Sequence, residues 1–243
     1  MPVKLFVPRE ARLHEKRVAL VPAVVEKLSK LGIDIHLQAG AGLAARIPDA
    51  AYEAAGVVMG GPPTDVQLIF SVQPPSVAEI EQMKPGTVLC CFVYAHRELA
   101  TVRALRDGQI TCFAMELVPR ITRAQAMDAL SSQAALAGYY AALLAATNLN
   151  RILPMMTTAV GSLRPARVLV MGAGVAGLQA LATAKRLGAM VEGYDVRPEV
   201  KEQVESVGGK FVDTGVSASG QGGYARELTE EEQAKVAEVL TRH

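Results

Sequence analysis

The sequence has little net charge and no apolar run long enough to cross a membrane. Its 25 basic and 24 acidic residues give a formal charge of +1, so the charge gives no support for binding to nucleic acid or to an anionic membrane surface. The longest apolar run covers residues 134–147, whereas a membrane span needs about 20 residues. We therefore expect a buried helix there, no direct membrane span and no nucleic-acid partner.

Cysteine is scarce, and no spacing typical of a metal site is present. An odd number of cysteines, two of them adjacent in an apolar run, favours small core residues in a reducing compartment; they are Cys90, Cys91 and Cys112. The histidines are scattered, so no metal site is predicted; they are His14, His36, His96 and His243. The first residues open into a strand pattern without a signal peptide. We expect a cytoplasmic protein that reaches a membrane only through partners.

Apolar residues make up 50% of the chain and charged residues 20%, as in ordinary globular α/β proteins. In the N-terminal half of the chain, short and continuously apolar runs alternate with helical patterns, which is typical of a parallel sheet covered on both faces. Strands are predicted at 3–8, 34–38, 67–72, 87–94 and 110–115, and helices at 22–31, 49–55, 76–83 and 97–107.

A long helical pattern over 122–149 leads into a second alternating region. There, strands are predicted at 167–171, 190–195 and 210–213, and helices at 175–187, 198–206 and 228–241. Residues 214–227 are rich in Gly and Ser, which predicts a mobile segment. The sequence thus predicts an α/β fold with two doubly wound, Rossmann-like parallel-sheet domains, the first at 1–150 including the linking helix and the second at 151–243.

The strongest motif is G-x-G-x-x-G, directly after an apolar strand and at the start of a helix. Gly172 makes the tight turn, Gly174 lets backbone approach a pyrophosphate, and Gly177 lets helix and strand pack closely. The pyrophosphate would lie on the free N–H groups at the helix N-terminus, beside Val175 and Ala176. The alternative is that these glycines serve only a tight βα turn.

Asp195 lies at the end of the following strand pattern. A carboxylate there accepts hydrogen bonds from the adenosine ribose and repels a 2′-phosphate, so it favours NAD over NADP. Arg197 keeps the NADP alternative open.

The segment 120–133, RITRAQAMDALSSQ, is polar within an otherwise apolar chain. On a continuous helix, Gln125, Asp128 and Ser132 would share one face, with apolar residues roughly opposite. Helical spacing alone leaves two interpretations open: the solvated side of an amphipathic helix, or a face that meets a ligand.

Three stretches make the chain resemble a known family: EKRVALVPAVVEKLSKLG, PRITRAQAMDALSSQ and VLVMGAGVAGLQALATAKRLGA. They are similar to the NAD(H)-binding alpha subunit of proton-translocating NAD(P) transhydrogenase over essentially the whole chain. The resemblance implies that the nicotinamide is held by Arg120, Gln125, Asp128 and Ser131. It also implies an adenosine site at Asp195, Val196 and Arg197, and a mobile loop whose Tyr224, beside Ala225, closes over the nucleotide.

Alanine dehydrogenase, a relative of the same fold, matches more loosely. It uses an Arg for the substrate carboxylate and a Lys and a His for binding and proton transfer; this chain has Arg17, Gln73 and Tyr94 at the matching positions. Oxidative deamination needs a positioned acid/base, whereas hydride transfer between nicotinamides needs close, oriented C4 atoms. His96 could partly substitute or face solvent, and Arg17 could belong to a substrate site or pair with Glu10 or Glu15.

The resemblance implies a chain that binds NAD(H) and passes hydride to NADP⁺ on a partner subunit, with proton translocation through a membrane subunit. A homodimer is the family expectation. The chain supplies only the first of two βαβ halves, so we expect a truncated second domain whose nicotinamide pocket lacks a wall. The alternatives are an alanine dehydrogenase-like oxidoreductase and a non-catalytic NAD-binding fragment.

Overall fold

The computed structural model describes residues 2–219 and 226–242. By its internal contacts the chain divides into two compact units, Met1–Ala129 and Leu130–His243. This division places the long connecting helix with the second unit, whereas the sequence placed the boundary after residue 150.

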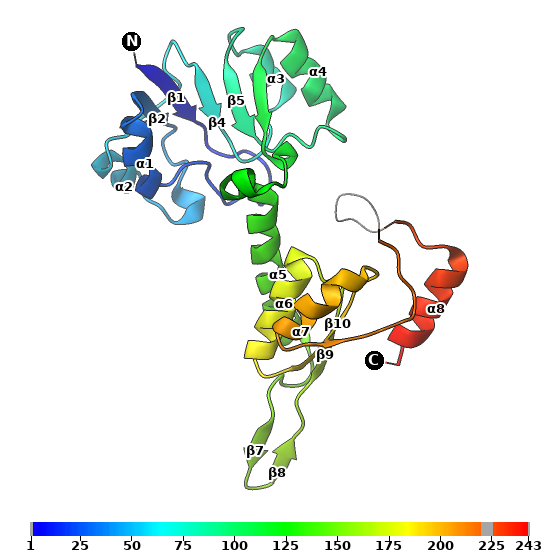
Figure 1. Ribbon diagram of the computed structural model, residues 1–243. Helices are drawn as coiled ribbons and strands as arrows, with labels where there is room; N and C mark the ends of the chain where they lie inside the picture. The colour runs from blue at the N-terminus through cyan, green and yellow to red at the C-terminus, as the bar shows by residue number, and fades with distance from the viewer. Residues whose placement is uncertain (1, 220–225, 243) are drawn as a thin grey trace. The chain divides into compact units, whose positions relative to one another are not determined.

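The first unit is built on one parallel sheet (Figure 1). Its strands are β1 (Val3–Val7), β2 (Ile33–Leu37), β3 (Val58–Met59), β4 (Leu68–Phe70), β5 (Val88–Cys91) and β6 (Thr111–Ala114). Their order is β3-β2-β1-β4-β5-β6, with every pairing parallel. The order reverses between β1 and β4, as in the doubly wound fold. The predicted α/β class with parallel sheets is confirmed, although the short β3 was not predicted.

Helices alternate with these strands and cover two apolar clusters. They are α1 (Pro22–Ser29), α2 (Asp49–Ala54), α3 (Val77–Glu81) and α4 (Leu99–Asp107). One cluster centres on Leu5, Leu37 and Tyr52, and the other on Ile80 and Leu89. These side chains are almost fully buried, which explains why their strands are continuously apolar rather than alternating.

The second unit has a three-stranded parallel sheet of order β11-β10-β9. The strands are β9 (Arg167–Met171), β10 (Met190–Tyr194) and β11 (Lys210–Phe211). They alternate with α6 (Val175–Arg186), a 3₁₀ turn at Pro198–Val200 and α7 (Lys201–Ser206), and α8 (Glu230–Leu240) follows later. An antiparallel hairpin of β7 (Met156–Thr158) and β8 (Gly161–Leu163) was not predicted.

The prediction of one helix over 122–149 is wrong at its beginning. Residues Thr122–Met127 form a 3₁₀ helix, Asp128 is non-helical at φ −74° and ψ 84°, and α5 covers Ala129–Asn148. Asp128 thus stands directly before α5, where Asp is favoured because its side chain competes for backbone N–H groups. Gln125 and Asp128 therefore do not share an α-helical face with Ser132.

Among the described residues, no helix combines the length and the apolar character that a membrane span requires. Within the same residues, no cluster of three or more His, Cys, Asp and Glu side chains is arranged to hold a metal ion.

Candidate dinucleotide-binding site

The G-x-G-x-x-G motif forms the turn from β9 into α6. Gly172 has a φ of +90°, a conformation that L side chains rarely adopt. Its N–H donates to the carbonyl oxygen of Tyr194 at 2.8 Å, which joins the turn to the end of β10. Gly174 follows as the N-cap of α6 and has no side chain to cap the helix. The first N–H groups of α6 therefore form the positive end of the helix, where an anion is favoured.

The other two glycines of the motif differ in what surrounds them. A Cβ on Gly177 would lie 1.8 Å from the carbonyl oxygen of Gly172, so only glycine lets α6 pack this closely on the turn. A Cβ on Gly174 would meet only Arg197 Nη2, at 4.0 Å. The space above Gly174 is therefore open, as expected where a pyrophosphate approaches the backbone.

Asp195 follows β10 and is only 8% exposed. Its Oδ2 accepts from the Ala173 N–H at 2.9 Å and from Arg197 Nη2 at 2.8 Å, and its Oδ1 accepts from Arg197 N and Nε, both at 2.9 Å. Burial acts to raise the pKa of Asp195, but these hydrogen bonds outweigh burial and lower it. The glycine turn, Asp195 and Arg197 thus form one connected unit.

A cavity of about 190 Å³ lies beside this unit. Asp195, Val196 and Pro198 line one side, and the segment Asp213–Ser217 lines another. The cavity adjoins the carboxyl end of β10, which is where the adenosine part of a dinucleotide is held in doubly wound folds. The contribution of Asp213–Ser217 was not apparent from the sequence.

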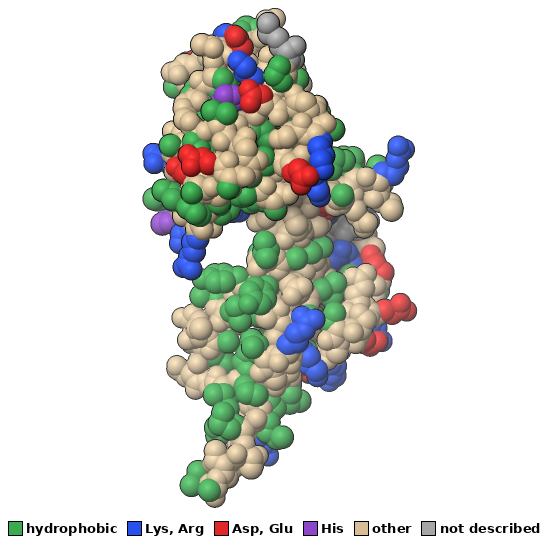
Figure 2. Space-filling view, turned by 90° about the vertical axis from the view of Figure 1, so that its left-hand side faces the viewer, with side chains coloured by type: hydrophobic (Ala, Val, Ile, Leu, Met, Phe, Trp, Pro, Cys, Tyr) green, Lys and Arg blue, Asp and Glu red, His purple; other side chains and the backbone are tan. Residues whose placement is uncertain are grey.

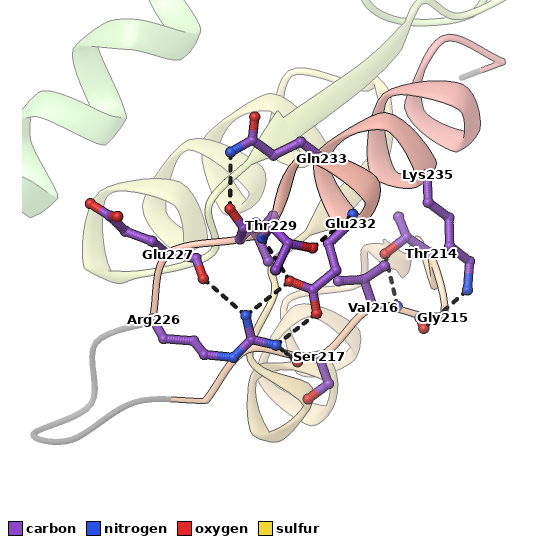
Figure 3. A network of polar contacts seen from close by, with 11 residues as sticks. Thr214, Gly215, Val216, Ser217, Arg226, Glu227, Thr229, Glu232, Gln233 and Lys235 are labelled. Carbon is purple, nitrogen blue, oxygen red and sulfur yellow. Dashed lines mark hydrogen bonds and ion pairs between the residues drawn. The ribbon is translucent and has the colours of Figure 1, made fainter.

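Arg226 fixes the base of the Gly- and Ser-rich loop (Figure 3). Its N–H donates to Ala218 O at 3.1 Å, and its guanidinium bonds to both carboxylate oxygens of Glu232, at 2.9 and 2.7 Å. Glu232 also belongs to the capping box with Thr229 that begins α8. The contact with Arg226 lowers the pKa of Glu232 to about 2. Tyr224 and Ala225, the predicted closing residues, lie outside the described residues.

The residues that the resemblance assigned to the nicotinamide are divided between the two units. Arg120, Gln125 and Asp128 belong to the first unit, and Ser131, in the first turn of α5, belongs to the second. Arg120 and Gln125 are exposed, while Asp128 and Ser131 are half-buried. Within one unit, the structure brings only Ser131 together with the glycine turn.

The positions that match the acid/base residues of alanine dehydrogenase carry a different network. Arg17 pairs with Glu15, with its Nη2 2.6 Å from Glu15 Oε2 and its Nε 2.8 Å from Oε1. Gln73 donates to Glu15 at 2.7 Å and accepts from Arg12 at 2.9 Å. The hydrogen bond from Arg17 lowers the pKa of Glu15 to about 2.

Of the two acidic partners considered for Arg17, the structure selects Glu15 for hydrogen bonding. Glu10 instead accepts from the N–H groups of Val72 and Gln73. The amide of Gln73 cannot exchange a proton as a lysine can. Tyr94 lies over Arg12, with the guanidinium carbon 6.0 Å from the ring centroid. This network was not predicted beyond Arg17, although the E-x-R spacing was a visible signal for it.

Comparison with known proteins agrees with this geometry. Residues 6–137 match the family model for the alanine dehydrogenase/PNT N-terminal domain, and residues 141–242 match that for the alanine dehydrogenase/PNT C-terminal domain. The first of the chains that make up NAD(P) transhydrogenase subunit alpha of Rhodospirillum rubrum is 46% identical over 99% of this chain and 66% of the relative. NAD(P) transhydrogenase subunit alpha of Haemophilus influenzae is 41% identical over 96% of this chain and 48% of the relative.

Alanine dehydrogenase of Mycobacterium tuberculosis is 32% identical over 84% of this chain and 56% of that protein. Among solved structures, a transhydrogenase from Sinorhizobium meliloti matches with a TM-score of 0.85 and 44% identity, covering 96% of this chain and 75% of that one. The chain thus spans about half to two thirds of the length of these curated relatives. It belongs to the alanine dehydrogenase/PNT family, and it is more similar to these transhydrogenase alpha subunits than to this alanine dehydrogenase.

Proposed function

We propose that this chain is the NAD(H)-binding component of an NAD(P) transhydrogenase. The observation that carries the proposal is the open cradle above Gly174, joined through Ala173 to a buried Asp195. The pyrophosphate would lie on the first N–H groups of α6, between Gly172 and Gly177. The adenosine would lie at Asp195, Val196 and Arg197, beside the cavity formed with Asp213–Ser217.

The nicotinamide would be oriented by Arg120, Gln125, Asp128 and Ser131, and the loop with Tyr224 and Ala225 would close over the nucleotide. NAD(H), when bound, supplies the hydride. These residues then have only to hold the ring in position and exclude water, since hydride transfer between nicotinamides moves no proton to the carbon. The replacement of an acid/base pair by Gln73 and Tyr94 supports this division of labour.

A single NAD(H) site requires a partner, so we propose that an NADP(H)-binding subunit receives the hydride. A membrane subunit would couple the transfer to proton translocation and hold this chain, as a homodimer, at the cytoplasmic side of the inner membrane. The names of the 40–46% identical relatives support a role as one component of such a complex.

The test combines the chain with NADH, an NADP⁺ analogue and an NADP(H)-binding partner, and follows reduction of the analogue. We expect reduction only when all components are present. Alanine-dependent formation of NADH without the partner would refute the proposal and favour an alanine dehydrogenase. Binding of NADH without turnover in either assay would contradict it and indicate a non-catalytic NAD-binding protein.

A further inference from the structure

Gly138 lies in the middle of α5, where glycine is unfavourable. The 20-residue helix is otherwise rich in Ala and Leu, and among residues other than proline, glycine is the poorest helix former. Its backbone is not in the left-handed region that would require glycine. Gly138 is nevertheless one of only two buried residues of the helix. A close contact, rather than local conformation, therefore accounts for glycine at this position.

That contact is with the glycine turn. A Cβ on Gly138 would lie 2.0 Å from the carbonyl oxygen of Ala176, 2.8 Å from its carbonyl carbon and 3.0 Å from its Cα. Ala176 lies in the first turn of α6, between Gly174 and Gly177. Figure 1 shows α5 and α6 lying side by side within the second unit. The backbone of α5 thus rests directly on the helix end proposed to bind the pyrophosphate.

Ser131 lies on the same face of α5 as Gly138. The two are seven residues apart, which is two helical turns and about 10 Å along the axis. Ala142, four residues after Gly138, is the other buried residue of α5 and packs in the cluster that contains Leu181 of α6. The face that carries Ser131 is therefore the face that packs toward α6.

An added methyl group at position 138 would displace α5 rather than α6. α6 is anchored by the close contact of Gly177 with Gly172 and by the buried side chains of Leu181 and Ala184. Most of α5 outside its contact face is exposed. Relief of the contact with Ala176 requires a shift of about 1 Å, a displacement large enough to cost about 100-fold in rate when it misplaces a reacting group.

We propose that Gly138 is a positioning residue that sets the distance between Ser131 and the glycine turn, and hence between the nicotinamide and the pyrophosphate. This inference rests on the proposed function. It predicts that Gly138→Ala separates binding of NADH from its reaction, because the pyrophosphate site stays on α6 while Ser131 moves with α5.

The experiment compares Gly138→Ala with the matched control Ala137→Gly, which weakens the same helix at an exposed neighbouring position. Three quantities are measured for each variant: thermal unfolding of the unliganded chain, NADH affinity together with the fluorescence of bound NADH, and hydride transfer in the reconstituted complex. For Gly138→Ala we expect an NADH dissociation constant within about threefold of the original, altered nicotinamide fluorescence and hydride transfer reduced by about 100-fold. For Ala137→Gly we expect lower thermal stability with fluorescence and hydride transfer unchanged.

Unchanged fluorescence and hydride transfer in Gly138→Ala would overturn the proposal, as would loss of NADH binding, which would make the contact a support of the pyrophosphate site itself. If the original chain binds NADH but transfers no hydride with any partner, the proposed function fails. The fluorescence and affinity of bound NADH then still decide whether Gly138 positions the nicotinamide.

Discussion

The carboxylate of Asp195 already has a full set of hydrogen bonds. A carboxylate offers about four acceptor positions, and the N–H of Ala173 together with the backbone and guanidinium of Arg197 supply donors to both oxygens. A ribose hydroxyl must therefore replace a contact from Arg197. The same pairing neutralises the guanidinium that would attract a 2′-phosphate, so both residues disfavour NADP.

Asp195→Ala tests this pairing. We expect the NADH dissociation constant to rise by about 1–3 kcal/mol in free energy, because hydrogen bonds to a charged group are lost. The affinity for NADPH relative to NADH should rise, since Arg197 is then released. Fluorescence titration with both nucleotides measures the change, and the double variant Asp195→Ala/Arg197→Ala should lose the relative gain for NADPH. Unchanged NADH affinity would refute the ribose assignment.

The Glu15–Arg17 pair predicts a pH dependence of stability. The pKa of Glu15 is lowered to about 2 in the folded chain, from an ordinary value of 4.5. The pair therefore stabilises the folded state fully above pH 4.5, and the stabilisation is lost as pH falls toward 2. Glu15→Gln should lower the free energy of unfolding at pH 7 and flatten its fall below pH 4.5, as measured by urea unfolding. Glu53→Gln, at an exposed position, should keep the original pH profile; an equal profile for Glu15→Gln would contradict the assignment.

At the scale of elements, the glycine turn separates binding from stability. Gly174→Ala adds a methyl group where only Arg197 lies as near as 4.0 Å, so the fold should be kept while loss of pyrophosphate contacts weakens NADH by about 1.5–3 kcal/mol. Gly177→Ala places a methyl group 1.8 Å from Gly172 O and should lower the free energy of unfolding by about 1–3 kcal/mol or more. Thermal unfolding and NADH titration of both variants check this. Equal thermal stability of the two variants would contradict the different roles.

The elements that the sequence predicted well are those whose pattern reports burial. The apolar runs gave β1 and β5, and the glycine fingerprint gave β9 and α6 with nearly correct bounds. The 3₁₀ segment at Thr122–Met127 was missed because its residues continue the helical pattern into α5, and only backbone geometry separates them. The β7–β8 hairpin was missed because both strands are exposed, so no apolar alternation marks them.

At the scale of the whole molecule, sequence pattern predicted the parallel class but not the pairings. The order β3-β2-β1-β4-β5-β6 and the network of Arg12, Glu15 and Gln73 depend on which chain segments meet in space. Asp195 was identified because its motif is local, whereas the Ala176 contact of Gly138 joins two helices and leaves no local signal. Local motifs therefore predicted the nucleotide site, and tertiary contacts supplied what positions it.

The proposed homodimer makes a prediction about an exposed apolar surface on the second unit. Residues 129–163 contain one charged residue, Arg151, yet large apolar side chains of α5 and the hairpin are exposed, among them Leu136 at 60%, Tyr140 at 63%, Met155 at 68% and Val160 at 98%. Figure 2 shows hydrophobic side chains continuing along this unit to its tapered end. The exposed apolar area is on the order of 1,000 Å², comparable with the roughly 800 Å² that each partner buries in a standard interface.

An uncharged apolar surface can be self-complementary, so it fits a second copy of the chain related by a two-fold axis. Leu136→Glu/Tyr140→Glu would bury four carboxylates at such an interface, and we expect the variant to be monomeric at concentrations where the original chain is a dimer. Leu31→Glu, at a 75% exposed position of the first unit, is the matched control and should remain dimeric. Sedimentation equilibrium distinguishes these outcomes. A dimer that persists in the double variant would show that this surface is not the interface.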